Sequence, residues 1–87
     1  MRRLIAETVE EFVDWITDQD NEELVTVNER IRGKDLHRMF INDNQDFTKL
    51  SERVFYRWFA AYVRYRFGVD PKSDKDVEGK YFIIEQK

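Results

Sequence analysis

The sequence predicts a single α+β domain that spans residues 1–87 and combines three helices with a small antiparallel sheet. Three observations support this class. Apolar residues recur every three or four positions in the segments 3–18, 33–42 and 51–67, which is the spacing of amphipathic helices. The run 80–85 has instead the aromatic and β-branched composition of a strand. The chain has no cysteine but seven Phe, four Tyr and two Trp, so its stability has to come from an aromatic core.

The longest helix is predicted over 51–67. Ser51 is a good N-cap, because its hydroxyl can accept a hydrogen bond from a free backbone N–H of the first turn. Gly68 suits the left-handed conformation in which helices often end. We expect one wide arc of this helix to pack on the core, and that arc holds Val54, Phe55, Trp58, Phe59, Ala61, Tyr62 and Tyr65.

The first helix is predicted over 3–18, with one apolar half and one acidic half. The acidic half should point away from any nucleic acid, since it would repel phosphate; it holds Glu7, Glu10, Glu11, Asp14 and Asp18. A polar break at 19–23 follows. The alternating, β-branched run 24–29 then predicts a short strand with Val27 facing the core, and 33–42 predicts the second helix.

The segment after Gly68 predicts a loop and a strand. Pro71 and the Ser-Asp-Lys-Asp run indicate a flexible loop. The strand 80–85 is expected to pair antiparallel with 24–29, and Asp76–Val77 to form a brief partner strand. The order helix, strand, helix, helix, short strand, strand is that of a winged helix, in which the second helix of the pair enters the major groove of DNA. The residues expected to be mostly buried are Phe12, Val13, Ile16, Leu36, Phe40, Phe55, Trp58, Phe59, Tyr62 and Ile83.

Two features depart from a typical winged helix. The connection at about 42–50 is longer than the usual three or four residues between the paired helices. The wing also mixes acids with lysines, which disfavours its contact with phosphates. These residues are Asp74, Asp76 and Glu78 beside Lys72, Lys75 and Lys80.

Positive charge is concentrated in the middle third of the chain. Residues 1–29 hold two basic and nine acidic residues (net −7), residues 30–67 nine basic and four acidic (net +5), and residues 68–87 four basic and five acidic (net −1). Within that third, three arginines of the long helix fall within about 40° on a helical wheel. The predicted nucleic-acid contacts are therefore Arg53, Arg57 and Arg64, with Lys34, Arg38 and Lys49 as flanking phosphate contacts.

The composition argues against catalysis and against a metal or cofactor site. His37 is the single histidine, and one histidine without cysteines forms no metal-binding cluster. The three glycines are scattered, so the chain has no phosphate-cradling loop. We expect no enzymatic activity, no cofactor and no small-molecule ligand. No apolar run has the roughly 18 residues of a membrane span, and the N-terminus lacks a signal-peptide pattern, so we expect a soluble cytoplasmic module without membrane contact.

The pattern DLHRMF, a polar gap, LSERVFYRWFAAYV and a closing GKYFIIE resembles the C-terminal winged-helix modules of phage, plasmid and mobile-element primase–helicase proteins, including the virulence-associated-protein-E-like group. The resemblance covers roughly residues 24–86. It implies an accessory domain that binds or positions nucleic acid at the end of a larger replication protein. The contact residues it implies are limited to Arg53, Arg57 and Arg64.

Two functions from different classes remain open at this point. The arginine row favours a winged helix that binds DNA or RNA weakly. The net charge of −3 and the acidic wing favour a protein-interaction or structural module, which would dock a partner on the acidic first helix or on the edge strand.

Overall fold

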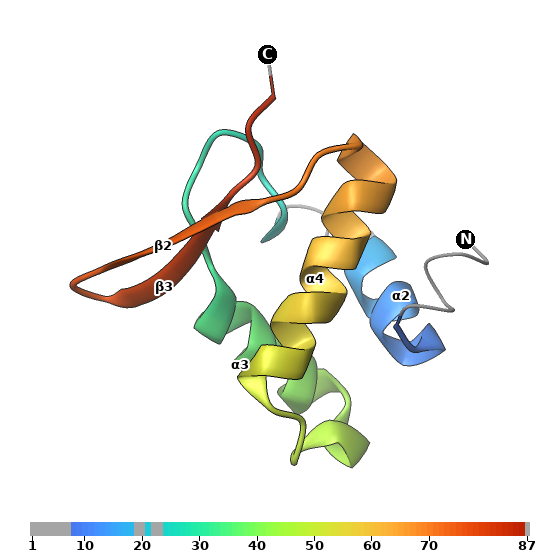
Figure 1. Ribbon diagram of the computed structural model, residues 1–87. Coiled ribbons are helices and arrows are strands. Elements are labelled where there is room, and N and C mark those ends of the chain that lie inside the picture. Colours follow the sequence, from blue (N-terminus) through green and yellow to red (C-terminus); the bar gives the residue numbers. More distant parts are fainter. Residues whose placement is uncertain (1–7, 19–20, 22–23, 87) are drawn as a thin grey trace.

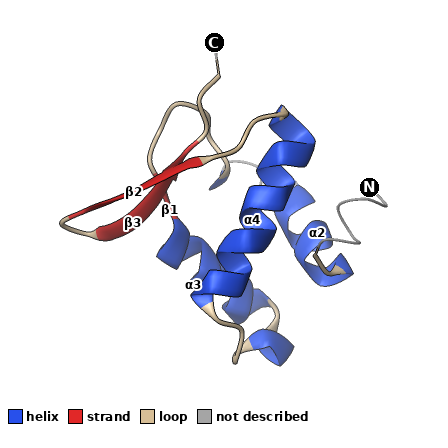
Figure 2. Ribbon diagram, viewed as in Figure 1, coloured by secondary structure: helices blue, strands red, loops and turns tan. Residues whose placement is uncertain are grey.

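A computed structural model describes residues 8–18, 21 and 24–86 of the chain (Figure 1). Its elements are α2 (Glu10–Thr17), β1 (Ile31–Arg32), α3 (Gly33–Asp43), the 3-10 helix η2 (Gln45–Phe47), α4 (Glu52–Phe67), β2 (Lys72–Asp76) and β3 (Gly79–Ile83). Helix α4 lies between α2 and the hairpin of β2 and β3, and this hairpin projects from the helices as a wing (Figures 1 and 2). The predicted winged-helix layout is confirmed.

Helix α4 begins and ends at the predicted caps. The Ser51 hydroxyl oxygen accepts a hydrogen bond of 3.3 Å from the backbone N–H of Val54. Gly68 has a φ of 72°, a left-handed conformation, and its N–H donates to the carbonyl of Arg64 at 3.0 Å. Because both caps form locally, the bounds of this helix follow directly from the sequence.

The other helices agree with the prediction apart from one boundary. Helix α2 begins at Glu10, after an extended Val9. Residues 3–7 of the predicted first helix lie outside the described residues. The long connection between α3 and α4 is confirmed, and η2 occupies its first part. None of the helices in the described part of the chain has the length and apolarity to cross a membrane.

The prediction of a strand over 24–29 is wrong. The strand that pairs with β3 is Ile31–Arg32, with Ile31 opposite Phe82. The chain turns at Asn28, whose φ of 60° breaks the extended conformation. Asn28 still joins the C-terminal segment, because its N–H donates to the carbonyl of Ile84 at 2.8 Å.

The prediction of a flexible loop over the Ser-Asp-Lys-Asp run is also wrong. These residues belong to β2, which pairs antiparallel with β3 along its whole length, from Lys72 opposite Ile83 to Asp76 opposite Gly79. The strand order is β1-β3-β2, so β2 is an edge. Its polar side chains have low strand propensity, but the apolar partner strand supplies the hydrogen-bonding template.

The core is an aromatic cluster in which the three helices meet. Phe12 of α2, Phe40 of α3 and Phe55 of α4 are fully buried, and their ring centroids are 5.6–5.9 Å apart. Eight of the ten residues predicted to be buried are so, while Trp58 and Ile83 are only half-buried. The core also holds residues outside that prediction, namely Trp15, Val25, Ile31, Ala61, Val63, Phe82 and Ile84.

Three side chains predicted to face inward do not. Ile83 lies outside the core because side chains alternate along the strand, and its neighbours Phe82 and Ile84 are the ones that point to the buried face. Val27 is 39% exposed, because the turn at Asn28 leaves only Val25 of that segment in the core. Tyr65 is 48% exposed near the end of α4, at the margin of the arc that packs on the other helices.

Candidate nucleic-acid interface

The arginine row on α4 lies on the side of the helix away from the core. Arg53, Arg57 and Arg64 are all exposed, while Phe55 and Phe59 on the opposite arc are fully buried. Arg53 and Arg64 are 11 residues apart, which corresponds to about 16 Å along the helix axis. The row is therefore long enough to follow part of one groove of a duplex.

The six predicted contact residues are all exposed, but they differ in their ion pairs. Arg64 pairs with Asp70 at 3.1 Å, just beyond the end of α4. Arg38 pairs with Asp35 on α3, also at 3.1 Å. Within the described part of the chain, neither Arg53 nor Arg57 forms an ion pair.

The two predicted lysines lie on different elements. Lys34 is in the first turn of α3, and Lys49 is in the connection before α4. Both are exposed. The predicted contacts therefore do not form one continuous site. Lys49 and Arg53 lie near the start of α4, whereas Arg64 lies at its far end and is paired with Asp70.

A groove of about 590 Å³ lies between the start of α4, the start of α3 and the wing. Its lining residues are Lys34, Glu52, Arg53, Tyr56, Lys75, Glu78, Gly79 and Lys80. Four of these are basic and two are acidic, so the groove carries a net positive charge. Of the predicted contacts, the structure brings only Lys34 and Arg53 together here; the wing supplies the other two cations.

Two lysines of the wing, Lys75 and Lys80, lie on a different face of the sheet from Asp74 and Asp76. Lys75 lies directly opposite Lys80 in the register of β2 and β3, so both side chains leave the same face of the sheet. Phe82 lies two residues beyond Lys80 on that face, and its ring packs 5.2 Å from both Tyr56 and Phe59 of α4. The lysines therefore face α4 and the groove.

The acids of β2 lie on the other face. Asp74 and Asp76 alternate with Lys75, so they point away from α4. The sequence-based expectation that the acids of the wing disfavour contact with phosphate did not take into account that Asp74 and Asp76 lie on the opposite face from Lys75. Glu78, at the tip, is the exception, because it lines the groove and also pairs with Arg32 at 2.9 Å.

The ring of Tyr56 lines the groove and lies close to Lys80. The Lys80 ammonium lies 5.1 Å from the ring centroid of Tyr56 and 5.4 Å from that of Phe82, within cation–π range. Burial raises the pKa of Tyr56 to about 12, and the neighbouring carboxylate of Glu52 adds to this effect. A Cβ at Gly33 would lie 2.7 Å from both rings, so only glycine permits this close approach.

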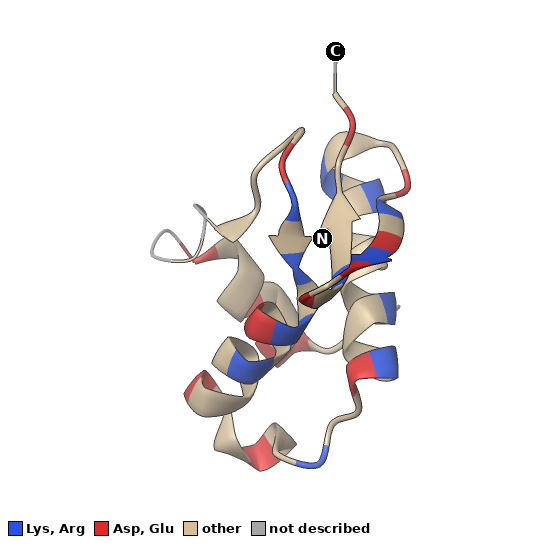
Figure 3. Ribbon diagram, turned by 90° about the vertical axis from the view of Figure 1, so that its left-hand side faces the viewer, with Lys and Arg blue, Asp and Glu red and all other residues tan. Residues whose placement is uncertain are grey.

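The sequence prediction missed Tyr56, Lys75 and Lys80. The missed signal is the alternation in the run Asp74–Lys75–Asp76, which places Lys75 on the face opposite the two aspartates once the segment is a strand. No signal in the sequence marks Tyr56, because it lies between the apolar arc and the arginine row of α4. A half-buried aromatic side chain is common at such a boundary and does not indicate a binding site. Figure 3 views the molecule from the side on which the wing projects, and shows basic positions on the helices and the wing interspersed with acidic ones.

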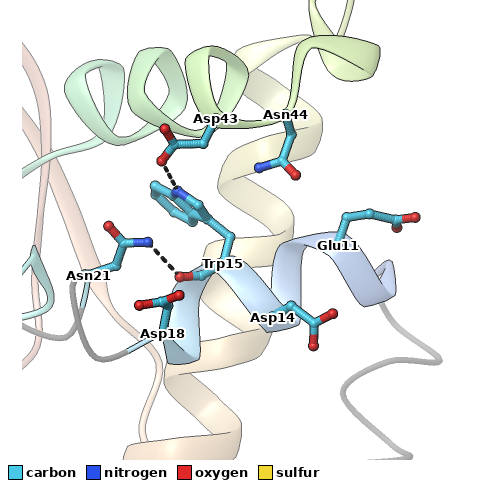
Figure 4. Close-up of a pocket in the computed structure, with 7 residues that line it drawn as sticks. All are labelled: Glu11, Asp14, Trp15, Asp18, Asn21, Asp43 and Asn44. Atoms are coloured by element: carbon cyan, nitrogen blue, oxygen red, sulfur yellow. Dashed lines mark hydrogen bonds between the residues drawn. The ribbon is translucent and has the colours of Figure 1, made fainter.

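A second hollow, of about 410 Å³, lies beside α2 and is acidic (Figure 4). The indole N–H of Trp15 donates to the carboxylate of Asp43 at 2.7 Å, and the Asn21 amide donates to the Trp15 carbonyl at 2.8 Å. Its other lining residues are Glu11, Asp14, Asp18 and Asn44. The bond between Trp15 and Asp43 ties α2 to the end of α3. The negative charge excludes this hollow as a phosphate site.

His37 has a structural role between α3 and α4. Its Nε2 lies 2.7 Å from the carbonyl oxygen of Leu50, and because a carbonyl only accepts, this nitrogen carries the proton. The ring also packs edge-on against Phe55 at 5.5 Å. Among the described residues, no group of three or more His, Asp or Glu side chains is arranged to hold a metal ion.

Comparison of the chain with protein-family models, with curated proteins and with solved structures gives no match.

Proposed function

We propose that this chain is a non-catalytic, nucleic-acid-binding winged-helix module whose preferred ligand is duplex DNA. The observation that carries the proposal is the groove in which Lys34, Arg53, Lys75 and Lys80, from α3, α4 and the wing, surround one space. Backbone phosphates are the ligands such a set of cations suits. Arg57, exposed one turn along α4 from Arg53, would lie next to base edges or the facing strand.

Duplex DNA fits this surface better than duplex RNA does. An α-helix with its side chains is about 10–12 Å across, and the major groove of B-DNA is about 12 Å wide. The major groove of A-form RNA is too narrow to admit side chains from a helix. With about three to five phosphate contacts, log K should fall against log salt with a slope of about −3 to −4.

The modest affinity that we expect for DNA suits a module that works within a larger protein. A module that neutralises so few phosphates gains most from a tether that raises its effective concentration at DNA. We infer that it belongs to a cytoplasmic replication or mobile-element protein, as the resemblance to primase–helicase modules implies, and positions DNA there.

The experiment is a fluorescence-anisotropy titration of duplex DNA, single-stranded DNA and duplex RNA at several salt concentrations. The matched variants are Lys75→Gln and Lys72→Gln, which remove the same charge from opposite faces of β2. Lys75→Gln should weaken duplex binding and make the salt slope shallower by about 1. Lys72→Gln should have little effect, because Lys72 pairs with Glu85 at 3.1 Å on the outer face.

Replacing Arg53, Arg57 and Arg64 with glutamate tests the α4 row in the same assay. It should abolish binding while the far-UV circular dichroism stays that of the wild type. A flat wild-type titration at about 50 mM salt, with the protein folded, contradicts the proposal. The interaction-module hypothesis then takes its place, with the acidic face of α2 as its surface, since β2 is a charged edge that resists strand pairing.

A further inference from the structure

On the outer face of the wing, one carboxylate holds two arginines. Arg32 binds Asp76 through both terminal nitrogens, each at 2.7 Å, and Arg30 binds the same side chain at 3.0 Å. Both guanidinium groups lie over the ring of Tyr81, at 4.8 and 5.6 Å from its centroid. We call these four residues, Arg30, Arg32, Asp76 and Tyr81, the clasp.

The clasp joins strands that are not hydrogen-bonded neighbours. Arg32 is in β1 and Asp76 is the last residue of β2, while β3 lies between them and contributes Tyr81 (Figure 2). The two outer strands are thereby tied together across the middle one. Asp76 also accepts a hydrogen bond of 2.9 Å from the backbone N–H of Glu78, which fixes the tip.

The Asp76 side chain is only 18% exposed, and the arginines hold the pKa of its carboxyl well below the usual range, chiefly through the hydrogen bonds from Arg32. The carboxylate is therefore ionised at any pH at which the protein is used. A bidentate pair between Arg32 and a carboxylate also fixes orientation, which a lysine cannot do.

The clasp lies directly behind the groove. Lys75 precedes Asp76 and leaves the opposite face of β2, so holding Asp76 from behind sets where Lys75 points. The β1–β3 ladder covers only two residue pairs, whereas β2 and β3 extend together over five. The wing therefore needs a second tie near its tip if Lys75 and Lys80 are to stay opposite α4.

We propose that the Asp76 clasp is a positioning device that holds the wing at the angle at which Lys75 and Lys80 contact the DNA backbone. This rests on the proposed function. It has an unusual consequence: an acidic residue next to the binding groove strengthens the binding of a polyanion.

Two variants separate this role from simple electrostatics. Asp76→Asn removes one negative charge and the carboxylate that Arg30 and Arg32 share, while Arg32 keeps its pair with Glu78. Electrostatics alone therefore predicts tighter binding to duplex DNA. Asp74→Asn makes the same change of charge on the same face of the same strand, and no arginine bonds to Asp74 among the described residues. We expect Asp74→Asn to tighten binding about twofold and Asp76→Asn to weaken it about five- to tenfold.

The salt slope gives a second readout that a loss of folded protein would not produce. Asp76→Asn should make the slope shallower by about 1–2, because Lys75 and Lys80 no longer contact phosphates together. Asp74→Asn should leave it unchanged. Asp76→Glu, which keeps the carboxylate, should restore most of the wild-type affinity and slope.

A second variant, which leaves the net charge of the protein unchanged, provides an independent test in case Asp76→Asn does not fold. Arg32→Lys keeps the positive charge but loses the bidentate bond, so positioning predicts weaker binding and electrostatics predicts no change. If Asp76→Asn binds more tightly, or Arg32→Lys binds like the wild type, the positioning role is overturned and the DNA-binding proposal stands. A wild-type protein that binds no duplex overturns both.

Discussion

Replacing Phe55 with alanine tests the packing of α4 most directly. Phe55 is fully buried, and its ring lies 5.6 Å from Phe12, 5.6 Å from Phe40 and 6.3 Å from Trp15. Removing about 150 Å² of buried apolar surface at about 25 cal/mol per Å² costs about 4 kcal/mol. This agrees with the roughly 3–5 kcal/mol typical of buried Phe-to-Ala changes.

The loss is large compared with the stability of so small a domain. At about 0.05–0.15 kcal/mol per residue, a chain of 87 residues has about 4–13 kcal/mol in total. Urea denaturation followed by circular dichroism should show Phe55→Ala with a midpoint lower by at least about 1 M, or already unfolded without urea. Val77→Ala is the matched control, because Val77 is fully exposed at the tip of the wing and should change stability by less than about 0.5 kcal/mol.

The result that refutes this reasoning is a Phe55→Ala protein whose unfolding free energy is within about 1 kcal/mol of the wild type. It would show that α4 packs through another arc, and the arginine row would then no longer be its outward side.

Three further predictions concern single contacts. Gly33→Ala should lower the melting temperature and shift the NMR signals of the Tyr56 and Phe82 rings, because its Cβ would lie 2.7 Å from both; unchanged ring signals would contradict this contact. Because the pKa of Tyr56 is raised from 10.0 to about 12 in the folded protein, the unfolded chain loses that proton first, so stability should fall as pH rises from 10.0 to about 12. Tyr56→Phe should remove part of that fall, as unfolding followed across this pH range will show. Ser51→Ala should cost about 1 kcal/mol in urea unfolding through loss of the N-cap, and an equal loss in Ser51→Thr would argue that the hydroxyl is not the cause.

Much of the helical part could be predicted because its causes are local. The caps at Ser51 and Gly68 act within one turn of α4, and the arc containing Phe55 follows from a period of 3.6 residues. The exposure of Arg53 and Arg57 follows from the same period.

The sheet was predicted less well because strand pairing depends on a distant partner. Nothing local to Lys72–Asp76 marks it as a strand; it becomes one because Gly79–Ile83 lies beside it. A shift of one residue exchanges the two faces, which is why Ile83 was expected in the core in place of Phe82 and Ile84.

The sequence by itself therefore determined the helices, the aromatic core and the outward arginine row, since each depends on residues a few positions apart. Only the tertiary structure decided that Lys75 and Lys80 face α4 while Asp76 binds Arg30 and Arg32 behind them. The physical reason is that these contacts join distant parts of the chain, since Arg30 and Arg32 lie 46 and 44 positions from Asp76. The pairing register of the wing then sets which side chains face α4.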